Sequence, residues 1–264
     1  MSDDIKREAA GEITPKDLIV SASPHVHDGG DVPTIMRDVV IALVPGLLVG
    51  LWFFGLGVLK VLVLAVGGCM AVEWGCQRLL KRPASLRDWS AAVTGVLLAM
   101  NLPSSSPWWM VLVGAVVAIG LGKVIYGGLG YNPFNPALVA RVFLLISFPV
   151  QMTRWTLPAG PTTGLDAATG ATPLGAVKEA VSLGRTVADA GAAGPRDLLL
   201  GGVGGSFGEV GALALLLGGL YLLWRGVIRW HIPAAFIGST VVITGIAHLA
   251  APDRYADPVF HVLA

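Results

Sequence analysis

The amino-acid sequence predicts an all-α polytopic membrane protein with at least seven transmembrane helices. Of its 264 residues, 54% are hydrophobic and 13% are charged, and the mean hydropathy is +0.72. Soluble domains carry about 25% charged residues, so the shortfall is too large for an unusual soluble core. Hydrophobic runs of nearly bilayer-spanning length recur along the chain, and Trp residues stand at their ends, as interfacial anchors do. The net charge of +1, with no basic stripe, argues against a nucleic-acid partner.

The hydrophobic runs divide the chain into four parts. Residues 1–36 form a polar segment, predicted to be cytoplasmic, and residues 37–150 form a first membrane half of five helices. Residues 151–205 contain no spanning run and form a long outer loop, and residues 206–264 begin a second, related membrane half. The predicted helices extend from about Val39 to Phe54, Val61 to Leu80, Trp89 to Leu102, Trp108 to Tyr126, Pro136 to Val150, Ser206 to Trp224 and Ile232 to Ala250.

Two helix starts carry local signals. Asn135 is suited to an N-cap, with Pro136 at the first helical position, and Asp257-Pro258 has the same pattern. The apolar run after Pro258 ends at Ala264, which is too short to cross a bilayer. We therefore expect either an interfacial tail or a second half that is truncated in this chain.

Lys and Arg residues predict the orientation. With the N-terminus inside, more of them flank the inner than the outer ends of the predicted helices, as cytoplasmic loops require. The bias places the N-terminus in the cytoplasm and the long loop in the periplasm. The inner set is Lys6, Arg7, Lys16, Arg37, Arg78, Lys81, Arg82, Arg87, Lys123, Arg225 and Arg229.

The long loop contains the segment Asp166-Ala167-Ala168-Thr169-Gly170-Ala171-Thr172-Pro173-Leu174. A hydroxyl that is to carry a bulky phosphate ester must lie on an accessible, ordered turn with small neighbours. Thr172 meets this requirement, because Gly170 and Ala171 leave room and Pro173 fixes the following backbone. Asp166 and Thr169 add nearby polar groups. Thr172 is the predicted attachment site.

Two charges, Glu73 and Arg141, lie inside hydrophobic runs, where ionisable groups are costly and functional by default. Both also lie close enough to a helix end to reach the interface. Two predicted helix breaks contain Asn101 and the pair Asn132 and Asn135. These asparagines either line an ion or cofactor cavity, as broken membrane helices do, or belong to ordinary loops. All five residues are candidates for an ion path or a charge partner.

No metal site is predicted. His25 and His27 lack a third ligand beyond Asp28, and Cys69 and Cys76 are too few for an iron–sulfur centre. Phosphate-binding loops and the Ser/His/Asp pattern of hydrolases are absent from the sequence, so those enzyme classes are excluded.

Three of these motifs carry a family resemblance. The Ser23-to-His27 lead-in, the Gly130-to-Ala137 run with Arg141, and the Thr172 segment occur in the order and spacing of the D-type subunits of the Rnf electron-transport complex. The chain also resembles the B-type subunits of the sodium-pumping NADH:quinone reductase, which have a longer segment before their first helix. The relatives continue through further helices, which favours the truncated second half.

The resemblance implies a translocase of the bacterial inner membrane that is active only as a multi-subunit complex. Such a complex passes electrons between ferredoxin and NAD while moving sodium ions or protons. FMN would be held by a phosphoester to Thr172, with Asp166, Thr169, Gly170 and Ala171 around it, and a non-covalent riboflavin would lie nearby. The implied partners are the other membrane, iron–sulfur and flavin subunits, a flavin transferase and lipid.

Two alternatives from other classes remain open. Two related halves with broken helices also suit a flavin-free solute channel or transporter, and a scaffolding component without a cofactor would need no attachment site. Bound flavin separates the electron-carrier hypothesis from both.

Overall fold

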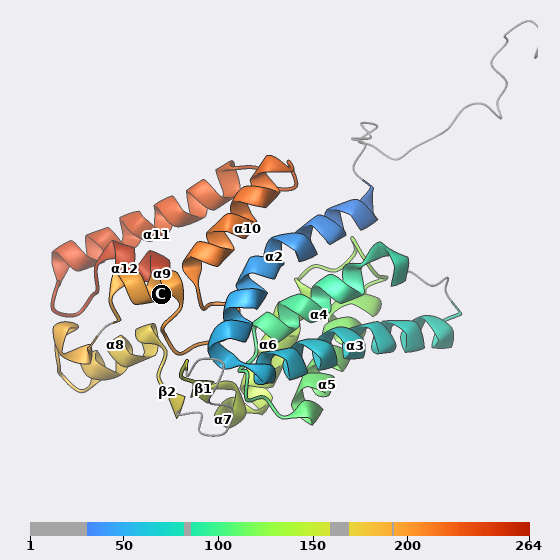
Figure 1. Ribbon diagram of the computed structural model, residues 1–264, viewed down its shortest axis with the longest axis horizontal. Helices are drawn as coiled ribbons and strands as arrows, with labels where there is room; N and C mark the ends of the chain where they lie inside the picture. The colour runs from blue at the N-terminus through green and yellow to red at the C-terminus, as the bar shows by residue number, and fades with distance from the viewer. Residues whose placement is uncertain (1–30, 82–85, 159–168, 192) are drawn as a thin grey trace, which may run out of the picture. The chain divides into compact units, whose positions relative to one another are not determined.

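The computed structural model describes residues 31–81, 86–158, 169–191 and 193–264 (Figure 1). The chain divides into two units, Met1–Asp31 and Val32–Ala264, and all the elements below belong to the second. His25 and His27 of the lead-in and Asp166 of the loop motif lie outside the described residues.

The described part contains seven apolar helical segments, which confirms the prediction of an all-α polytopic membrane protein. Three helices are long and apolar enough to cross a membrane: α2 (Val32–Phe54), α3 (Leu56–Leu79) and α11 (His231–Ala250). Four segments are shorter: α4 (Ser90–Met100), α5 (Trp108–Val116) with its continuation η2 (Val117–Val124), α6 (Pro136–Ser147) and α10 (Ala212–Trp224).

Short elements fill the connections between these helices. A single turn, η1 (Leu86–Asp88), precedes α4. The long loop holds α7 (Pro149–Met152), β1 (Trp155–Thr156), β2 (Thr169–Gly170), α8 (Pro173–Ser182), η3 (Ala188–Ala190) and α9 (Pro195–Leu200), and α12 (Pro258–Leu263) follows α11. β1 and β2 pair antiparallel, with Trp155 opposite Gly170 and Thr156 opposite Thr169.

Both predicted helix starts are confirmed. The Asn135 side chain accepts a hydrogen bond from the Ala137 N–H at 2.9 Å, with Pro136 in the first turn of α6. Asp257 caps α12 in the same way by accepting from the Phe260 N–H at 2.8 Å. In each case one of the N–H groups that a helix start leaves without an intrahelical partner is satisfied.

The sixth predicted helix begins later than the sequence suggested. Residues 201–211 form turns rich in glycine, and α10 starts only at Ala212. Gly201 and Gly211 adopt positive φ angles of 104° and 84°, which side-chain-bearing residues rarely adopt. Ser206 and Phe207 are fully buried in this stretch. The hydrophobicity that predicted a helix here therefore comes from a buried non-helical connection.

Helix contacts in the membrane region depend on glycine. A Cβ added at Gly95 of α4 would lie 2.6 Å from Cα of Val66 in α3, so only glycine lets these backbones approach so closely. A Cβ at Gly218 of α10 would overlap the carbonyl oxygen of Ala42 in α2. Glycine therefore joins α3 to α4 and α2 to α10 by direct backbone contact.

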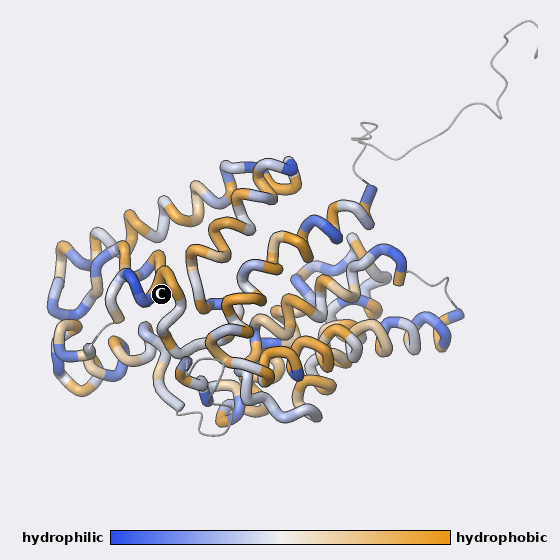
Figure 2. Tube along the Cα trace, viewed as in Figure 1, coloured by the Kyte–Doolittle hydropathy of each residue, from blue (hydrophilic) through white to orange (hydrophobic). Residues whose placement is uncertain are grey.

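The hydrophobic side chains are not confined to the interior. Figure 2 shows hydrophobic residues along much of the length of the helices, and Trp52, Leu220 and Leu249 are 64%, 61% and 85% exposed. Helices that are apolar all round suit a lipid environment. The buried core lies among α3, α4, α5, η2 and α6, and a smaller one joins α8, α9 and α12 through Val177, Leu198, Ala256 and Phe260.

Candidate functional site

Thr172 caps helix α8. Its Oγ1 accepts a hydrogen bond from the Gly175 N–H at 3.1 Å, and Pro173 occupies the first turn. Thr172 is half-buried, whereas its neighbours Thr169 and Ala171 are exposed. The hydroxyl thus lies on an ordered turn next to exposed residues, at the end of α8 where the helix dipole is positive.

Small residues keep this turn open. A Cβ added at Gly175 would lie 3.0 Å from Oγ1 of Thr172, so a side chain there would crowd the hydroxyl. Gly170 is half-buried and packs against Leu157, whose Cδ2 would be 2.9 Å from an added Cβ. The same Cδ2 of Leu157 would lie 3.0 Å from a Cβ added at Gly204. The glycine-rich stretch 201–211 thus runs beside the Thr172 turn.

The turn is tied to the membrane helices through β1. Thr156 is buried, and its hydroxyl shares a hydrogen bond of 2.6 Å with the hydroxyl of Ser104, in the turn between α4 and α5. The Ser104 carbonyl in turn packs against Gly57 at the start of α3, where an added Cβ would be 2.9 Å away. The Thr172 loop is therefore held at the end of the helices where α2 meets α3 and α4 meets α5.

Replacing Thr156 by Val is expected to loosen this attachment. The change keeps the shape but leaves the buried Ser104 hydroxyl without its partner, at a cost of about 1–3 kcal/mol. Amide hydrogen exchange in a peptide covering Trp155–Thr156 should become faster. The control is Thr153→Val, because the exposed Thr153 hydroxyl only donates to the Pro149 carbonyl at 2.8 Å. Equal exchange in the two variants would contradict the proposed attachment.

Two of the predicted polar residues meet in one cluster. Arg141 of α6 donates to Oδ1 of Asn101 at 2.6 Å and forms an ion pair with Glu209 at 3.2 Å. Asn101 ends α4, and its Nδ2 donates to the Leu97 carbonyl at 2.7 Å. The Arg141 and Glu209 side chains are 30% and 47% exposed, so the cluster opens to its surroundings.

The other two predicted asparagines do not join this cluster. Asn135 caps α6, and the exposed Asn132 donates to the Phe134 carbonyl at 2.9 Å. Both bonds stabilise the connection before α6. Glu209 was missed in the sequence analysis, which placed it near the start of the predicted helix from Ser206 to Trp224, whereas α10 begins only at Ala212.

Glu73 forms a buried ion pair. Nζ of Lys123 lies 2.8 Å from each carboxylate oxygen of Glu73, and the two side chains are 3% and 2% exposed. The same ammonium donates to Oγ of Ser90 at 2.5 Å, and Gln77 donates to Glu73 at 3.1 Å. Glu73 is thus buried and paired within the helix bundle.

Lys123 was predicted to lie at the inner surface because it stands near the end of an apolar run. The structure places it in η2, a π-helix, which turns its side chain into the core. The apolar residues on both sides of Lys123 in the sequence were the signal that could have predicted its burial.

A third ion pair joins α2 to the residue that follows α10. The buried Asp38 of α2 accepts from Arg225 at 2.9 Å and from the Tyr221 hydroxyl at 3.1 Å. The hydrogen bond and charge of Asp38 raise the pKa of Arg225, which follows α10. Arg225 therefore stays charged, and the pair links the start of α2 to the end of α10.

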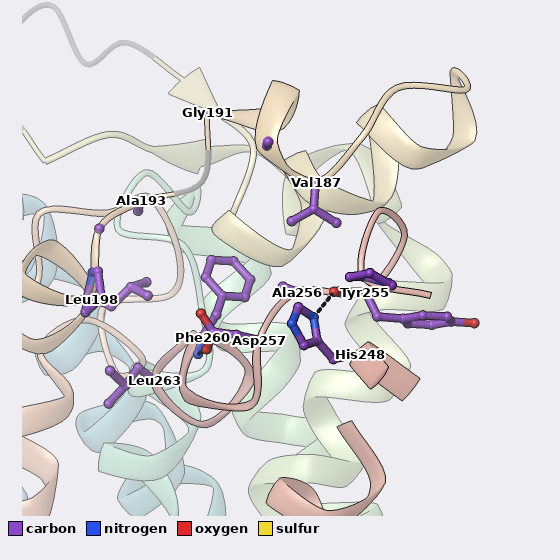
Figure 3. Close-up of a pocket in the computed structure, with 14 residues that line it drawn as sticks. Val187, Gly191, Ala193, Leu198, His248, Tyr255, Ala256, Asp257, Phe260 and Leu263 are labelled. Carbon is purple, nitrogen blue, oxygen red and sulfur yellow. Dashed lines mark hydrogen bonds between the residues drawn. The ribbon is translucent and has the colours of Figure 1, made fainter. Parts of the chain in front are cut away.

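A cavity of about 490 Å³ lies between the η3–α9 region and the end of α11 with α12 (Figure 3). Val187, Leu198 and Phe260 give it an apolar lining, and His248 places Nδ1 2.7 Å from the Tyr255 carbonyl. Near its rim, hydrogen bonds from the Thr186 side chain and backbone lower the pKa of Asp189. The cavity adjoins the small core that supports α8.

Comparison with known proteins identifies the family. The model of the NQR2, RnfD, RnfE family matches residues 19–264. The chain belongs to this family. The resemblance to the D-type Rnf proteins is confirmed, and a multi-pass membrane protein agrees with the apolar helices.

Curated relatives cover most of this chain. It is 42% identical to the D component of the ion-translocating oxidoreductase complex of Halorhodospira halophila, over 92% of this chain and 74% of the relative. The protein of the same name from Vibrio atlanticus is 40% identical, over 94% and 78%. The D component of the Na(+)-translocating ferredoxin:NAD(+) oxidoreductase complex of Acetobacterium woodii is 43% identical, over 94% and 73%.

Proposed function

We propose that the chain is the membrane subunit of an Rnf-type, redox-driven ion-translocating complex in a bacterial inner membrane, and that it carries FMN esterified to Thr172. The observation that carries the proposal is the position of the Thr172 hydroxyl. It lies on an ordered turn with small neighbours, and the loop that bears it is tied to the membrane helices. The names of the relatives support an oxidoreductase complex.

The residues around Thr172 suit a phosphate ester. A phosphate on Oγ1 would lie at the positive end of the α8 dipole, where free backbone N–H groups favour anions. The Gly175 N–H already donates to Oγ1, and glycine there leaves space for the phosphate oxygens. Exposed Thr169 and Ala171, with Gly170, leave the approach to the hydroxyl open, and Asp166 belongs to the same proposed site.

FMN supplies one- and two-electron chemistry, so it can join iron–sulfur carriers to other flavins. This chain would hold the phosphate and orient it, while partner subunits deliver and remove electrons. A flavin transferase would make the ester. A riboflavin, which the family resemblance implies, belongs to the same proposal without residues assigned to it.

The proposed orientation has the Thr172 loop in the periplasm. The loop shares its end of the bundle with the α2–α3 and α4–α5 turns. The opposite end, where α3 finishes and α2 begins, bears Arg37, Arg78 and Lys81. The positive-inside rule favours this end for the cytoplasm.

The charged clusters belong to the proposal as an ion path or as charge partners. Glu73 lies in the membrane region with its charge buried. Arg141 donates to Asn101 and pairs with Glu209, and the side chains of this ion pair are partly exposed. Asn132 and Asn135, whose bonds stabilise the connection before α6, are the weaker candidates.

The proposal is tested on the complex purified from cells that contain the flavin transferase. After denaturation and electrophoresis, the band of this chain is expected to fluoresce as a flavin, and its absence in cells without the transferase is the control. Reduced ferredoxin and NAD should drive ion uptake into vesicles that contain the complex. A non-fluorescent chain from cells with an active transferase would refute the electron-carrier function.

A further inference from the structure

We propose that Glu73 and Ser90 form a seat for a sodium-sized monovalent cation, and that the Lys123 ammonium fills this seat in the present conformation. The inference rests on the proposed ion-translocating function and adds a competitor for the ion that is built into the chain. Lys123 would have to leave before a cation could bind.

The geometry around Lys123 is that of a bound cation. Three oxygen atoms surround Nζ: both carboxylate oxygens of Glu73 at 2.8 Å and the hydroxyl of Ser90 at 2.5 Å. Carboxylate and hydroxyl oxygens are the ligands that hard cations prefer. A sodium ion in place of the ammonium would keep the same net charge beside Glu73, so the carboxylate would not be left uncompensated.

Stability alone does not explain this pair. Burying two charges costs several kcal/mol per ion, and apolar residues of similar volume often serve stability as well or better. Ionisable residues inside a membrane protein are expected to serve a function. Lys123 also lies on a π-helix, a rare conformation that is frequent at functional sites.

A polar route connects the seat to the surface. Ser90 Oγ donates to Asp88 at 2.5 Å, and Asp88 is half-buried in η1, just before α4. Asp88 thus offers a second carboxylate on the way from the interface to Glu73. Trp89, between Asp88 and Ser90 in the chain, has a left-handed backbone with φ of 64°, which is costly for a residue with a side chain. The strained residue lies at the entrance to the proposed seat.

The flexible stem of Lys123 makes exchange feasible. Four methylene groups allow the ammonium to withdraw while the backbone stays in place. The relative from Acetobacterium woodii is named for sodium translocation, which makes sodium the cation to test.

The test uses Lys123→Met in the intact complex, because methionine has a similar length and no charge. Equilibrium binding of ²²Na⁺ to the purified complex, with choline balancing the ionic strength, is expected to rise by one sodium per chain over the wild type. Adding Glu73→Gln should remove this extra site, and adding Ser90→Ala should weaken it at least tenfold. Lys60→Met, at an exposed lysine of α3, is the matched control and should change nothing.

Several outcomes would overturn the inference. If Glu73 takes up a proton instead of sodium, Lys123→Met will bind no additional sodium. An extra site that survives Glu73→Gln would lie elsewhere. Lys123→Met that assembles in neither sodium, lithium nor potassium salts would show that a cation cannot replace the ammonium. Flavin fluorescence of the same band separates the two proposals, because a flavin-bearing variant without extra sodium leaves the proposed function intact.

Discussion

Replacing Thr172 by Ala is expected to remove all covalently bound flavin from the denatured chain. Alanine has no hydroxyl to esterify, so the effect should be complete and not graded. It also removes the N-cap of α8, which costs about 1 kcal/mol. In-gel flavin fluorescence, with the mass of the tryptic peptide, measures the result.

Two further variants separate attachment from capping. Thr172→Asn retains a side chain that caps helices well but cannot form the phosphoester, so it should also lose the flavin. Thr172→Ser keeps both the cap and the hydroxyl and should retain it. Thr169→Ala, at the exposed threonine of the same segment, should fluoresce like the wild type. Fluorescence in Thr172→Asn would place the ester on another residue.

Replacing Gly218 by Ala is expected to disrupt the contact between α2 and α10. The added methyl group would overlap the Ala42 carbonyl oxygen, which belongs to backbone and cannot rotate away. Overpacking of this kind costs about 1–3 kcal/mol or more. At roughly 2–4 °C per kcal/mol for a chain of this size, the unfolding midpoint in detergent should fall by several degrees.

Gly219 provides the matched control for this change. It is the next residue of the same helix, and an added Cβ there meets nothing within 4 Å. Gly219→Ala should therefore leave the midpoint unchanged or raise it slightly, since alanine favours helix formation. A similar loss of stability in both variants would mean that α10 tolerates no substitution in this turn, and would contradict the specific contact with Ala42.

Features that depend on neighbouring residues were predictable from the sequence. The caps at Asn135 and Asp257 need only a side chain and an N–H two or three residues away, so local patterns suffice. The composition predicted the membrane class because apolar helices face lipid. Thr172 was predicted to lie on an ordered turn, and the structure adds that it caps a helix.

Contacts between distant residues were not predictable in this way. Lys123 and Glu73 are separated by 50 residues, and Ser104 and Thr156 by 52. Their meeting depends on how helices pack and, for Lys123, on a π-helical segment that residue types do not specify. The same holds for Glu209, whose partner Arg141 lies 68 residues earlier. A single sequence shows that a charge stands within an apolar run but not which partner neutralises it.

The contact of α2 with α10 also determines how long α2 remains without this partner during synthesis. Asp38 and Tyr221 are 183 residues apart, and ribosomes add about 5–20 residues per second. Helix α2 therefore spends on the order of ten to forty seconds in the membrane before Tyr221 and Arg225 exist. During that interval the Asp38 carboxylate, Gly46 and Gly50 have not met Arg225, Leu215 and Phe207, which later contact them. Although α10 is translated after the long loop, its arrival completes the contacts of helix α2.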